Sequence, residues 1–373
     1  MAEDFKVTAY DVEGKVDYEK LVSKFGIKPI SRELAERFEK DAGGLHFMMR
    51  RGIIFAHRDL DWLLDKYEHG EKFYLYTGIA PSGKMTIAHL VPFIFTKWLQ
   101  DRFGAEVYIQ IPDEEKFLAK KDQGLTLEKV HELAREAALN ILALGFDLKK
   151  TRIFLDTEYA DFLYKQAVRV SKYLTFSVVK DAYGFGPDTN VGTLFYPSMQ
   201  TVPAFMKSVQ EGRNVPCLIP LGVDQDVHFR VGRNAIEKLG YYKPAIVHAK
   251  FLPGLKGEPK MSASRPEAAI YLSDSPETVR KKINTAITGQ QPTAELQKKL
   301  GGDPDKCSVC QYYRFLFEPD DRKLEKIFEG ERKGTILAGE HKYALAKTIN
   351  EFLEEHRSKK EALKGKLEGV MLR

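Results

Sequence analysis

Two hydrophobic periods alternate through the central part of the chain. Short apolar runs at 73–77, 107–111 and 152–155 are typical of buried β-strands. Between them, residues 86–102 and 126–145 carry apolar side chains at intervals of three and four, which is the pattern of amphipathic helices. Strands that alternate with helices predict a parallel sheet covered on both faces. We therefore expect a Rossmann-like α/β domain that binds ligands at the carboxyl ends of its strands.

The alternating pattern resumes after one interruption. Residues 157–212 are less regular and contain helical stretches around a Gly-Phe-Gly-Pro turn. Two further strands are expected at 217–220 and 245–248. The prediction is a catalytic domain at 71–270 with an insertion at about 157–212.

The N-terminal region has a different pattern. Residues 1–70 predict a small hairpin that turns at Gly14 and charged amphipathic helices near 31–41 and 57–69. Ordinary packing explains all of these features. We expect an extension that packs on the catalytic unit.

The C-terminal region is charged and helical. Ser275 and Pro276 form a cap and first-turn pair, and apolar residues between 340 and 370 recur at helical spacing. We expect residues 271–373 to form an all-helical domain.

Composition adds little to this picture. With 43% apolar and 11% aromatic residues, the 373-residue chain can bury a full core. The net charge of +5 is compatible with a polyanionic partner but does not require one. The N-terminus lacks the apolar segment of a signal peptide, and no apolar run is long enough to cross a bilayer. We expect a soluble cytoplasmic protein without a membrane partner.

The chain has three cysteines, too few for a disulfide framework. Cys307 and Cys310 form a C-x-x-C pair, and the remaining cysteine is the distant Cys217. Since zinc sites of this kind usually need a second pair, we expect no bound zinc or cluster.

Two loops are candidates for phosphate chemistry. The first follows strand 73–77, contains Gly78, Ser82 and Gly83, and leads into a helix with His89 in its first turns. Glycines let the backbone approach a ligand closely, and the free N–H groups of a helix start favour negative charge. The second follows strand 245–248 and presents Lys260 among glycines and prolines, which is typical of a mobile loop.

These two loops resemble the signatures of the class I aminoacyl-tRNA synthetases. Residues 86–89, Thr-Ile-Ala-His, resemble the His-x-Gly-His motif, and residues 260–264, Lys-Met-Ser-Ala-Ser, resemble the Lys-Met-Ser-Lys-Ser loop. The stretches at 4–7, 57–59, 93–101 and 224–226 resemble the tryptophanyl-tRNA synthetases of archaea and eukaryotes, and the resemblance covers nearly the whole chain.

The resemblance implies a reaction and its partners. Tryptophan and ATP, which is accompanied by Mg²⁺, would form tryptophanyl-adenylate and pyrophosphate, and the tryptophan would then pass to tRNA(Trp). The N-terminal extension would cover the ATP side of the site. The insertion would carry a homodimer contact and part of the amino-acid pocket, and the helical domain would bind the anticodon.

The resemblance also assigns site residues. Catalytic roles fall on residues that can contact the ATP phosphates: Lys260, His89, Thr86, Ser262, Ser264 and Lys116. ATP-binding positions are Gly78, Ser82, Gly83, Ala88, His89 and Met261. Tryptophan would be held by polar residues, with Gln110, Glu115 and Gln200 for its ammonium and Tyr76 and Gln225 for its indole N–H. Asp224 is a further candidate, and an N-cap role is equally open for it.

The sequence departs from the family signatures at three positions. Thr86 replaces the first histidine, and its hydroxyl could either bond a phosphate oxygen or cap the helix. Ala88 replaces a glycine on which adenine would lie, which implies altered ATP binding. Ala263 stands where many class I enzymes have a second lysine, and Lys116 is a candidate to replace that charge.

Other functions stay open. A tyrosine–tRNA ligase would share the fold and both signatures, although Trp98 with its neighbours and residues 224–226 favour tryptophan. A catalytically silent RNA-binding relative is a second alternative, against which the intact Lys260, His89 and Glu115 argue.

Overall fold

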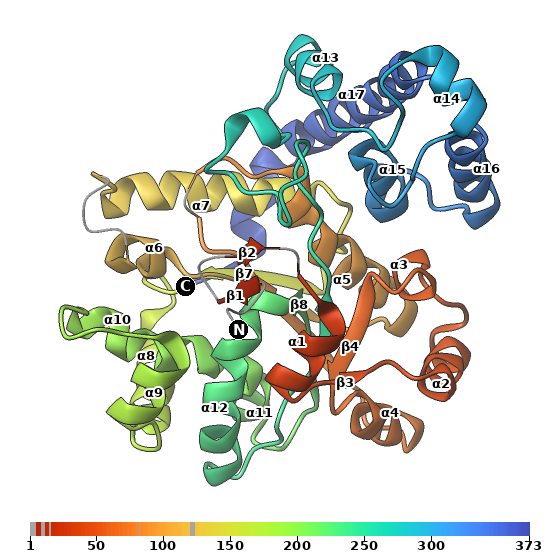
Figure 1. Cartoon of the computed structure of the whole chain (residues 1–373). Helices are drawn as coiled ribbons and strands as arrows, with labels where there is room; N and C mark the ends of the chain where they lie inside the picture. The colour runs from red at the N-terminus through yellow and green to blue at the C-terminus, as the bar shows by residue number, and fades with distance from the viewer. Residues whose placement is uncertain (1–4, 9–11, 15, 82, 120–123) are drawn as a thin grey trace.

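The computed structural model describes residues 5–8, 12–14, 16–81, 83–119 and 124–373 (Figure 1). Among these, one sheet contains strands β3 (Lys28–Pro29), β4 (Ile54–Arg58), β5 (Tyr74–Gly78), β6 (Val107–Ile111), β7 (Thr151–Leu155), β8 (Cys217–Gly222), β9 (Ala245–Ala249) and β10 (Met371–Leu372). Their spatial order is β10-β7-β6-β5-β8-β9-β4-β3. A separate antiparallel hairpin pairs β1 (Phe5–Val7) with β2 (Val12–Gly14).

The central strands are parallel and confirm the Rossmann-like prediction. Strand β5 lies between β6 and β8 and is parallel to both. The chain leaves β5 toward β6 and β7 and later returns to β8 and β9 on the other side. Such a reversal leaves a crevice at the carboxyl ends of the two central strands, where ligands of open α/β sheets bind.

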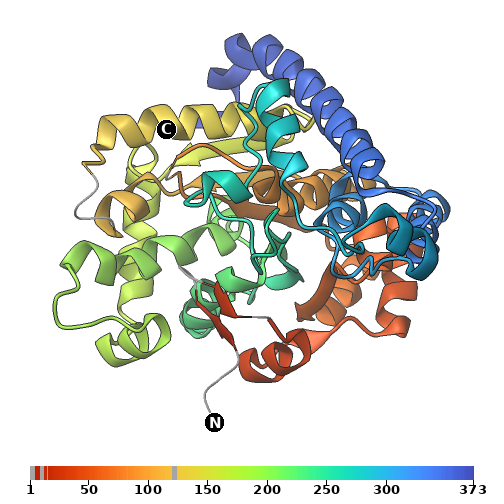
Figure 2. The ribbon, with the colours of Figure 1, turned by 45° about the horizontal axis from the view of Figure 1, so that its top comes forward.

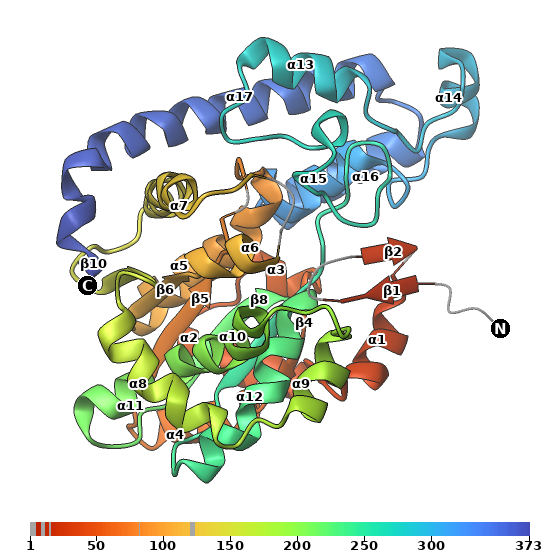
Figure 3. The same cartoon turned by 90° about the vertical axis from the view of Figure 1, so that its left-hand side faces the viewer.

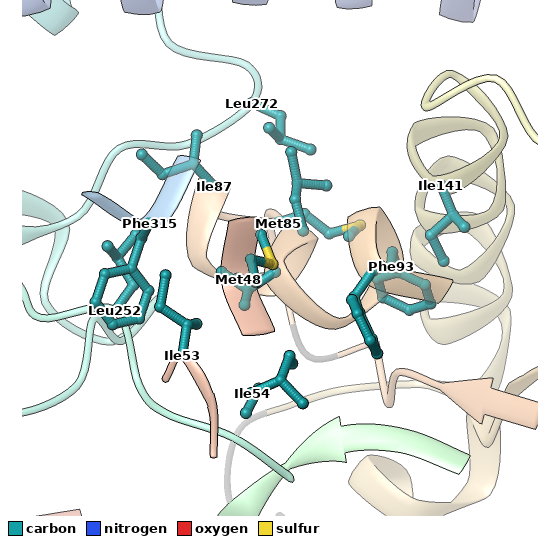
Figure 4. Packing of buried hydrophobic residues seen from close by; sticks show 14 of the residues in the cluster. Met48, Ile53, Ile54, Met85, Ile87, Phe93, Ile141, Leu252, Leu272 and Phe315 are labelled. Carbon is teal, nitrogen blue, oxygen red and sulfur yellow. The ribbon is translucent and has the colours of Figure 1, made fainter. Parts of the chain in front are cut away.

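Successive strand residues point to opposite faces of the sheet. Leu75, Ile109 and Val247 join a core that includes α5 (Leu90–Phe103) and α7 (Leu127–Leu142). Tyr76 and Phe154 join a second core with α8 (Ala160–Ser171) and α12 (Asp226–Lys238). Figure 4 shows part of the first core, where Phe93 lies beside Ile141 and Leu272 lies near Met85 although they come from distant segments.

The N-terminal region differs from its prediction at two points. Gly14 is the last residue of β2 and pairs with Phe5, so it does not form the turn; residues 9–11 are outside the described part of the chain. His57 and Arg58 belong to β4, which pairs antiparallel with β9, and the helix expected from 57 begins only at Leu60. The N-terminal region therefore contributes strands to the central sheet. Its helices are α1 (Tyr18–Phe25), α2 (Arg32–Ala42), α3 (Phe47–Arg50) and α4 (Leu60–Glu68).

The insertion at about 157–212 is helical. It consists of α8, α9 (Phe176–Tyr183), α10 (Val191–Thr201), the 3₁₀ turn η2 (Val202–Ala204) and α11 (Met206–Glu211). These helices lie on the lower left in Figure 1, together with α12. Between β6 and α7 the chain also forms α6 (Asp113–Ala119).

The C-terminal region is helical, as predicted, with one addition. It contains α13 (Pro276–Asn284), α14 (Ala294–Leu300), α15 (Ser308–Tyr312), α16 (Asp321–Arg332) and α17 (Ala338–Leu363). Ser275 caps α13 by accepting the N–H of Thr278, as expected. After α17 the chain returns to the sheet, where β10 pairs with β7 (Figure 3). Within the described residues, no helix is long and apolar enough to cross a membrane.

Candidate active site

The two signature loops lie against each other. Ile87 donates its N–H to the carbonyl of Ile270 over 3.0 Å, and Leu272 donates to Met85 over 2.9 Å. The hydroxyl of Tyr271, between these partners, donates to the carbonyl of Ala263 in the lysine loop over 2.7 Å. Figure 4 shows the side chains of Met85, Ile87 and Leu272 close together. Backbone contacts therefore hold the histidine and lysine signatures in one place.

This place is the crevice at the carboxyl ends of β5 and β8. Gly78 ends β5 so close to β6 that a Cβ on it would lie 2.7 Å from the carbonyl oxygen of Gln110. The glycine is thus required by strand packing. A Cβ on Gly83 would have no atom within 4 Å, so that side of the loop is open. Ser82 lies outside the described residues.

The tautomer of His89 is fixed by its neighbour. Thr86 donates its backbone N–H to Nδ1 of His89 over 2.9 Å. Burial and the positive charge of Lys260 lower the pKa of His89 to about 4, so the ring is neutral at pH 7. Since Nδ1 accepts, the single proton is on Nε2, which is a hydrogen-bond donor. Thr86 is fully buried at the start of the turn η1 (Ile87–His89), which favours the capping alternative for this residue.

Lys260 stands at the edge of the crevice and pairs with Asp224. Its Nζ lies 2.5 Å from Oδ2 of Asp224 and 5.2 Å from the ring centre of Phe251. The side chain of Lys260 is 37% exposed, whereas Asp224 is buried. Asp224 lies in the turn η3 (Val223–Gln225) and does not cap α12, whose N-cap residue is Gln225.

The remaining lysine-loop residues differ in accessibility. Met261 is buried and donates its N–H to Leu252 over 2.8 Å. The hydroxyls of Ser262 and Ser264 lie 2.9 Å apart, and Ser264 is exposed. The two serines are therefore available to a ligand, whereas Met261 anchors the loop.

A buried polar network lines the other side of the crevice. The hydroxyl of Tyr76 donates to Oε1 of Gln110, and Gln200 donates its Nε2–H to that hydroxyl over 3.1 Å. Tyr196 in α10 donates to Oε1 of Gln200 over 2.5 Å. The structure thus brings three predicted tryptophan-binding residues together: Tyr76, Gln110 and Gln200. Gln225 does not bond Tyr76; it follows Asp224 in the chain and is half-buried.

Glu115 and Lys116 continue this network from α6. Lys116 Nζ lies 2.7 Å from Oε1 of Glu115, and the Tyr196 hydroxyl lies 3.5 Å from Oε2. Glu115 is 8% exposed. The positive charges of Lys260 and Lys116 both lower the pKa of His89.

Two carboxyl groups of the network were missed by the sequence analysis. Asp156 accepts the Nε2–H of Gln110 over 2.7 Å, while its Oδ1 and both carboxyl oxygens of Glu114 have no hydrogen-bond donor among the described residues. Burial raises the pKa of both groups above the usual carboxyl range. Asp156 follows β7 directly, and that position at a strand's carboxyl end was the available signal.

Two of the resemblance segments contact each other. Arg58 donates from Nε and from an Nη group to the two oxygens of Asp226 over 2.8 and 2.7 Å. His248 Nε2 lies 2.8 Å from Oδ1 of the same carboxylate. Burial alone would raise the pKa of Asp226, but the Arg58 and His248 contacts hold it well below its usual range. These residues join β4, α12 and β9 and have a structural role.

The two walls of the crevice therefore differ in chemistry. Lys260 and the N–H donor of His89 lie on one wall, and the carboxyl groups of Glu114, Glu115 and Asp156 lie on the other. Such a site suits a ligand that carries phosphates at one end and an ammonium at the other.

Comparisons with known proteins agree with this geometry. The family model described as tRNA synthetases class I (W and Y) matches residues 68–354. The tryptophan–tRNA ligase of Sulfolobus acidocaldarius is 48% identical over 367 residues, which cover 98% of this chain and 94% of that protein. That of Pyrobaculum calidifontis is 45% identical and covers 100% of this chain and 99% of its own.

Solved structures of tryptophanyl-tRNA synthetases have the same fold as this chain. The tryptophanyl-tRNA synthetase of Plasmodium falciparum superposes with a TM-score of 0.88 at 38% identity, over 94% of this chain and 96% of that one. That of Aeropyrum pernix superposes with a TM-score of 0.86 at 32% identity, over 95% and 96% of the two chains. The chain therefore belongs to the class I tRNA synthetases of the tryptophan and tyrosine group, and within that group to the tryptophan–tRNA ligases.

Proposed function

We propose that this chain activates L-tryptophan with ATP and transfers it to tRNA(Trp). The observation that carries the proposal is the pair of signature loops, held together by hydrogen bonds at the carboxyl ends of β5 and β8. This crevice combines a lysine and a histidine donor with a buried acidic network. The ligase names of the relatives support tryptophan as the amino acid.

In the first step, a carboxylate oxygen of tryptophan attacks the α-phosphorus of MgATP. The bond from that phosphorus to the bridging oxygen breaks, and pyrophosphate leaves with the electron pair. Little covalent chemistry is left to the protein, so catalysis consists of positioning and charge stabilisation. Lys260 would leave Asp224 and contact the departing phosphates. The side chain of Lys260 is 37% exposed, which leaves it room to make that change of partner.

His89 would act as a neutral donor. Its Nε2–H can hydrogen-bond a phosphate oxygen while Thr86 holds Nδ1 from the other side. Because the pKa is about 4, the ring keeps this form across the neutral range. Ser262 and Ser264 would add hydroxyl contacts from the lysine loop.

The amino-acid end would bind in the acidic network. An ammonium has three N–H donors, and three carboxyl oxygens of Glu114 and Asp156 accept no N–H from any described residue. Glu115 would accept from the same ammonium, exchanging its contact with Lys116. The ammonium would also draw Asp156 and Glu114 toward their ionised forms.

We assign the indole N–H to the hydroxyl of Tyr76 or to a side-chain oxygen of Gln110 or Gln225. Tyr76 and Gln110 already bond each other, so an indole would have to open that contact. A tyrosine side chain would leave the same polar groups partly unpaired and would lose apolar contact, which disfavours it.

The other parts of the chain take roles from the same proposal. Residues 271–373 would bind the anticodon, although β10 near their end belongs to the central sheet. A homodimer is proposed through the insertion, because α8, α9 and α10 expose a set of large apolar side chains: Tyr164, Val168, Phe176, Val178 and Val191. The protein would work in the cytoplasm.

Charging of tRNA tests this proposal. Transcripts of tRNA(Trp) and tRNA(Tyr) are each incubated with the chain, MgATP and labelled tryptophan or tyrosine. Label should appear only in the combination of tryptophan with tRNA(Trp). Charging of tRNA(Tyr) with tyrosine would instead support the tyrosine enzyme, and no charging by a folded protein that binds tRNA would support a silent relative.

A further inference from the structure

We propose that the helical C-terminal region contains a structural zinc site formed by Cys307, Cys310, Glu331 and His341. The donor atoms of these four residues all lie within 4.8 Å of one another. All four residues are buried, with His341 the most exposed at 3%. The site lies outside the crevice and plays no part in the proposed ligase reaction.

The four residues come from three helices. Cys307 is the N-cap residue of α15 and Cys310 lies in its first turn. Glu331 is the penultimate residue of α16, and His341 lies in the first turn of α17. The sequence contains no second cysteine pair, but the fold brings a carboxylate and an imidazole from two later helices to the first pair.

Unused polar atoms point into the cluster. Among the described residues, Glu331 Oε1 and both ring nitrogens of His341 have no hydrogen-bond partner. The distance from Nδ1 of His341 to Oε2 of Glu331 is 3.3 Å, but without hydrogen-bond geometry. Buried polar atoms are nearly always partnered, and leaving one unpaired costs stability. A cation between them would satisfy Glu331 Oε1 and one of the two ring nitrogens of His341.

Neighbouring side chains orient the ligands. Gln290 donates its Nε2–H to Glu331 Oε2 over 2.6 Å, which leaves Oε1 for a metal. The His341 ring is stacked on Tyr313 at 5.7 Å and 9°. Such outer contacts are characteristic of protein metal sites.

The donor set selects zinc. Two thiolates, an imidazole and a carboxylate match the tetrahedral ligands of Zn²⁺, whereas Mg²⁺ and Ca²⁺ prefer oxygen donors and iron–sulfur clusters usually need four cysteines. Zinc bond lengths imply donor separations of about 3.3–3.8 Å. The donor atoms lie up to 4.8 Å apart, so the most distant of them would have to approach by about 1 Å to bind zinc. Side-chain rotations can produce such a movement. Four protein ligands leave no open position, so the site is structural.

The site also lies close to the segment that precedes the lysine loop. Ser308, which follows Cys307, donates its hydroxyl to the carbonyl of Gly254 over 3.3 Å and its N–H to Ile287 over 3.0 Å. Ile287 in turn donates to Leu255 over 2.8 Å. Zinc would therefore stabilise the attachment of α15 to this segment.

Metal analysis of the full chain tests the proposal. The protein is purified without chelator, and its metals are measured by mass spectrometry after dialysis. About one zinc per chain is expected in the wild type and in the Cys217→Ser control, which removes a buried cysteine elsewhere. The Cys307→Ser/Cys310→Ser double variant should hold none.

Conservative variants keep the test decisive if the double variant fails to fold. His341→Phe preserves the stack on Tyr313 but removes a ligand, so it should weaken zinc binding by about tenfold or more. His341→Cys replaces the imidazole with another zinc ligand and should keep zinc bound. Gln290→Leu should weaken zinc binding by about 10–100-fold. Added Co²⁺ should give the thiolate charge-transfer and ligand-field bands of a tetrahedral ion. Absence of zinc and of these bands, a Cys307–Cys310 disulfide, bound iron, or undiminished affinity in His341→Phe would each overturn the assignment.

Discussion

Asp224 and Asp226 are two residues apart and hold cations in opposite ways. Asp226 is fully buried, accepts two hydrogen bonds from Arg58 and contacts His248. Asp224 holds Lys260 by a single contact, and the lysine is 37% exposed on a loop. A buried pair with several hydrogen bonds fixes geometry, whereas a partly exposed lysine held by one contact can turn to another partner. The difference separates a structural ion pair from one that can serve a reaction.

The largest expected effect concerns stability. Asp226→Asn should lower the free energy of unfolding by about 3–5 kcal/mol, because it leaves Arg58 without its buried partner. Asp224→Asn should lower it by less than about 1 kcal/mol, because Lys260 can turn to solvent. Urea unfolding of both variants measures the difference. Equal losses would remove the distinction between the two pairs.

The effect of Asp226 should depend on pH. Its pKa is lowered in the folded protein, so the unfolded chain binds its proton first as the pH falls. The stabilisation is present above the unfolded pKa of about 3.9 and is lost below it. The stability gap between the wild type and Asp226→Asn should therefore narrow in unfolding curves recorded below about pH 4.

The next effect concerns the rate of adenylate formation. Lys260→Ala should slow that step by about 10²–10³-fold, the usual cost of removing one group that stabilises developing charge. The dissociation constant of tryptophan should hardly change, since Lys260 contacts the phosphates. Single-turnover kinetics and tryptophan titration separate the two quantities, with Lys256→Ala as a control at an exposed lysine nearby. A parallel loss of rate and tryptophan affinity would assign Lys260 to another role.

A smaller effect is expected on the acidic wall. Glu115→Gln should raise the KM for tryptophan by about 10–100-fold, because a charged hydrogen bond is worth about 1.5–3 kcal/mol. The KM for ATP should change much less. Steady-state kinetics check this, with the exposed Glu128→Gln as the matched control. If the KM for ATP rose instead, the positions assigned to ATP and tryptophan in the crevice would have to be exchanged.

The smallest effect concerns Ala88. Ala88→Gly should change the KM for ATP by at most about fourfold, since one methyl group corresponds to about 0.8 kcal/mol of contact. The KM for tryptophan should stay nearly constant. If both constants stayed the same, Ala88 would lie away from the adenine.

The sequence predicted the parts of the fold that depend on local pattern. Strand β6 matches its predicted range of 107–111, because five buried residues in a run allow few other structures. The two-residue strands β3 and β10 have no period of their own and exist only because the sheet offers an edge. Residues 57–69 contain the helical pattern of α4, so the sequence places His57 and Arg58, the end of β4, in that helix; only the pairing with β9 reveals the strand.

The candidate site follows the same division. The two signature loops were predicted because their residues are contiguous. The buried carboxyls of Asp156 and Glu114, and the approach of Glu331 and His341 to the cysteine pair, depend on which helices meet, and no short stretch of sequence contains that information. Figure 2 shows the C-terminal helices, in shades of blue, gathered at the upper right of the molecule.

The central claim is that this crevice activates tryptophan, and ATP–pyrophosphate exchange tests it most directly. The reaction is run with tryptophan, with tyrosine and without an amino acid. The account predicts exchange with tryptophan alone. Exchange with tyrosine, or no exchange with either amino acid by a folded protein, would contradict it.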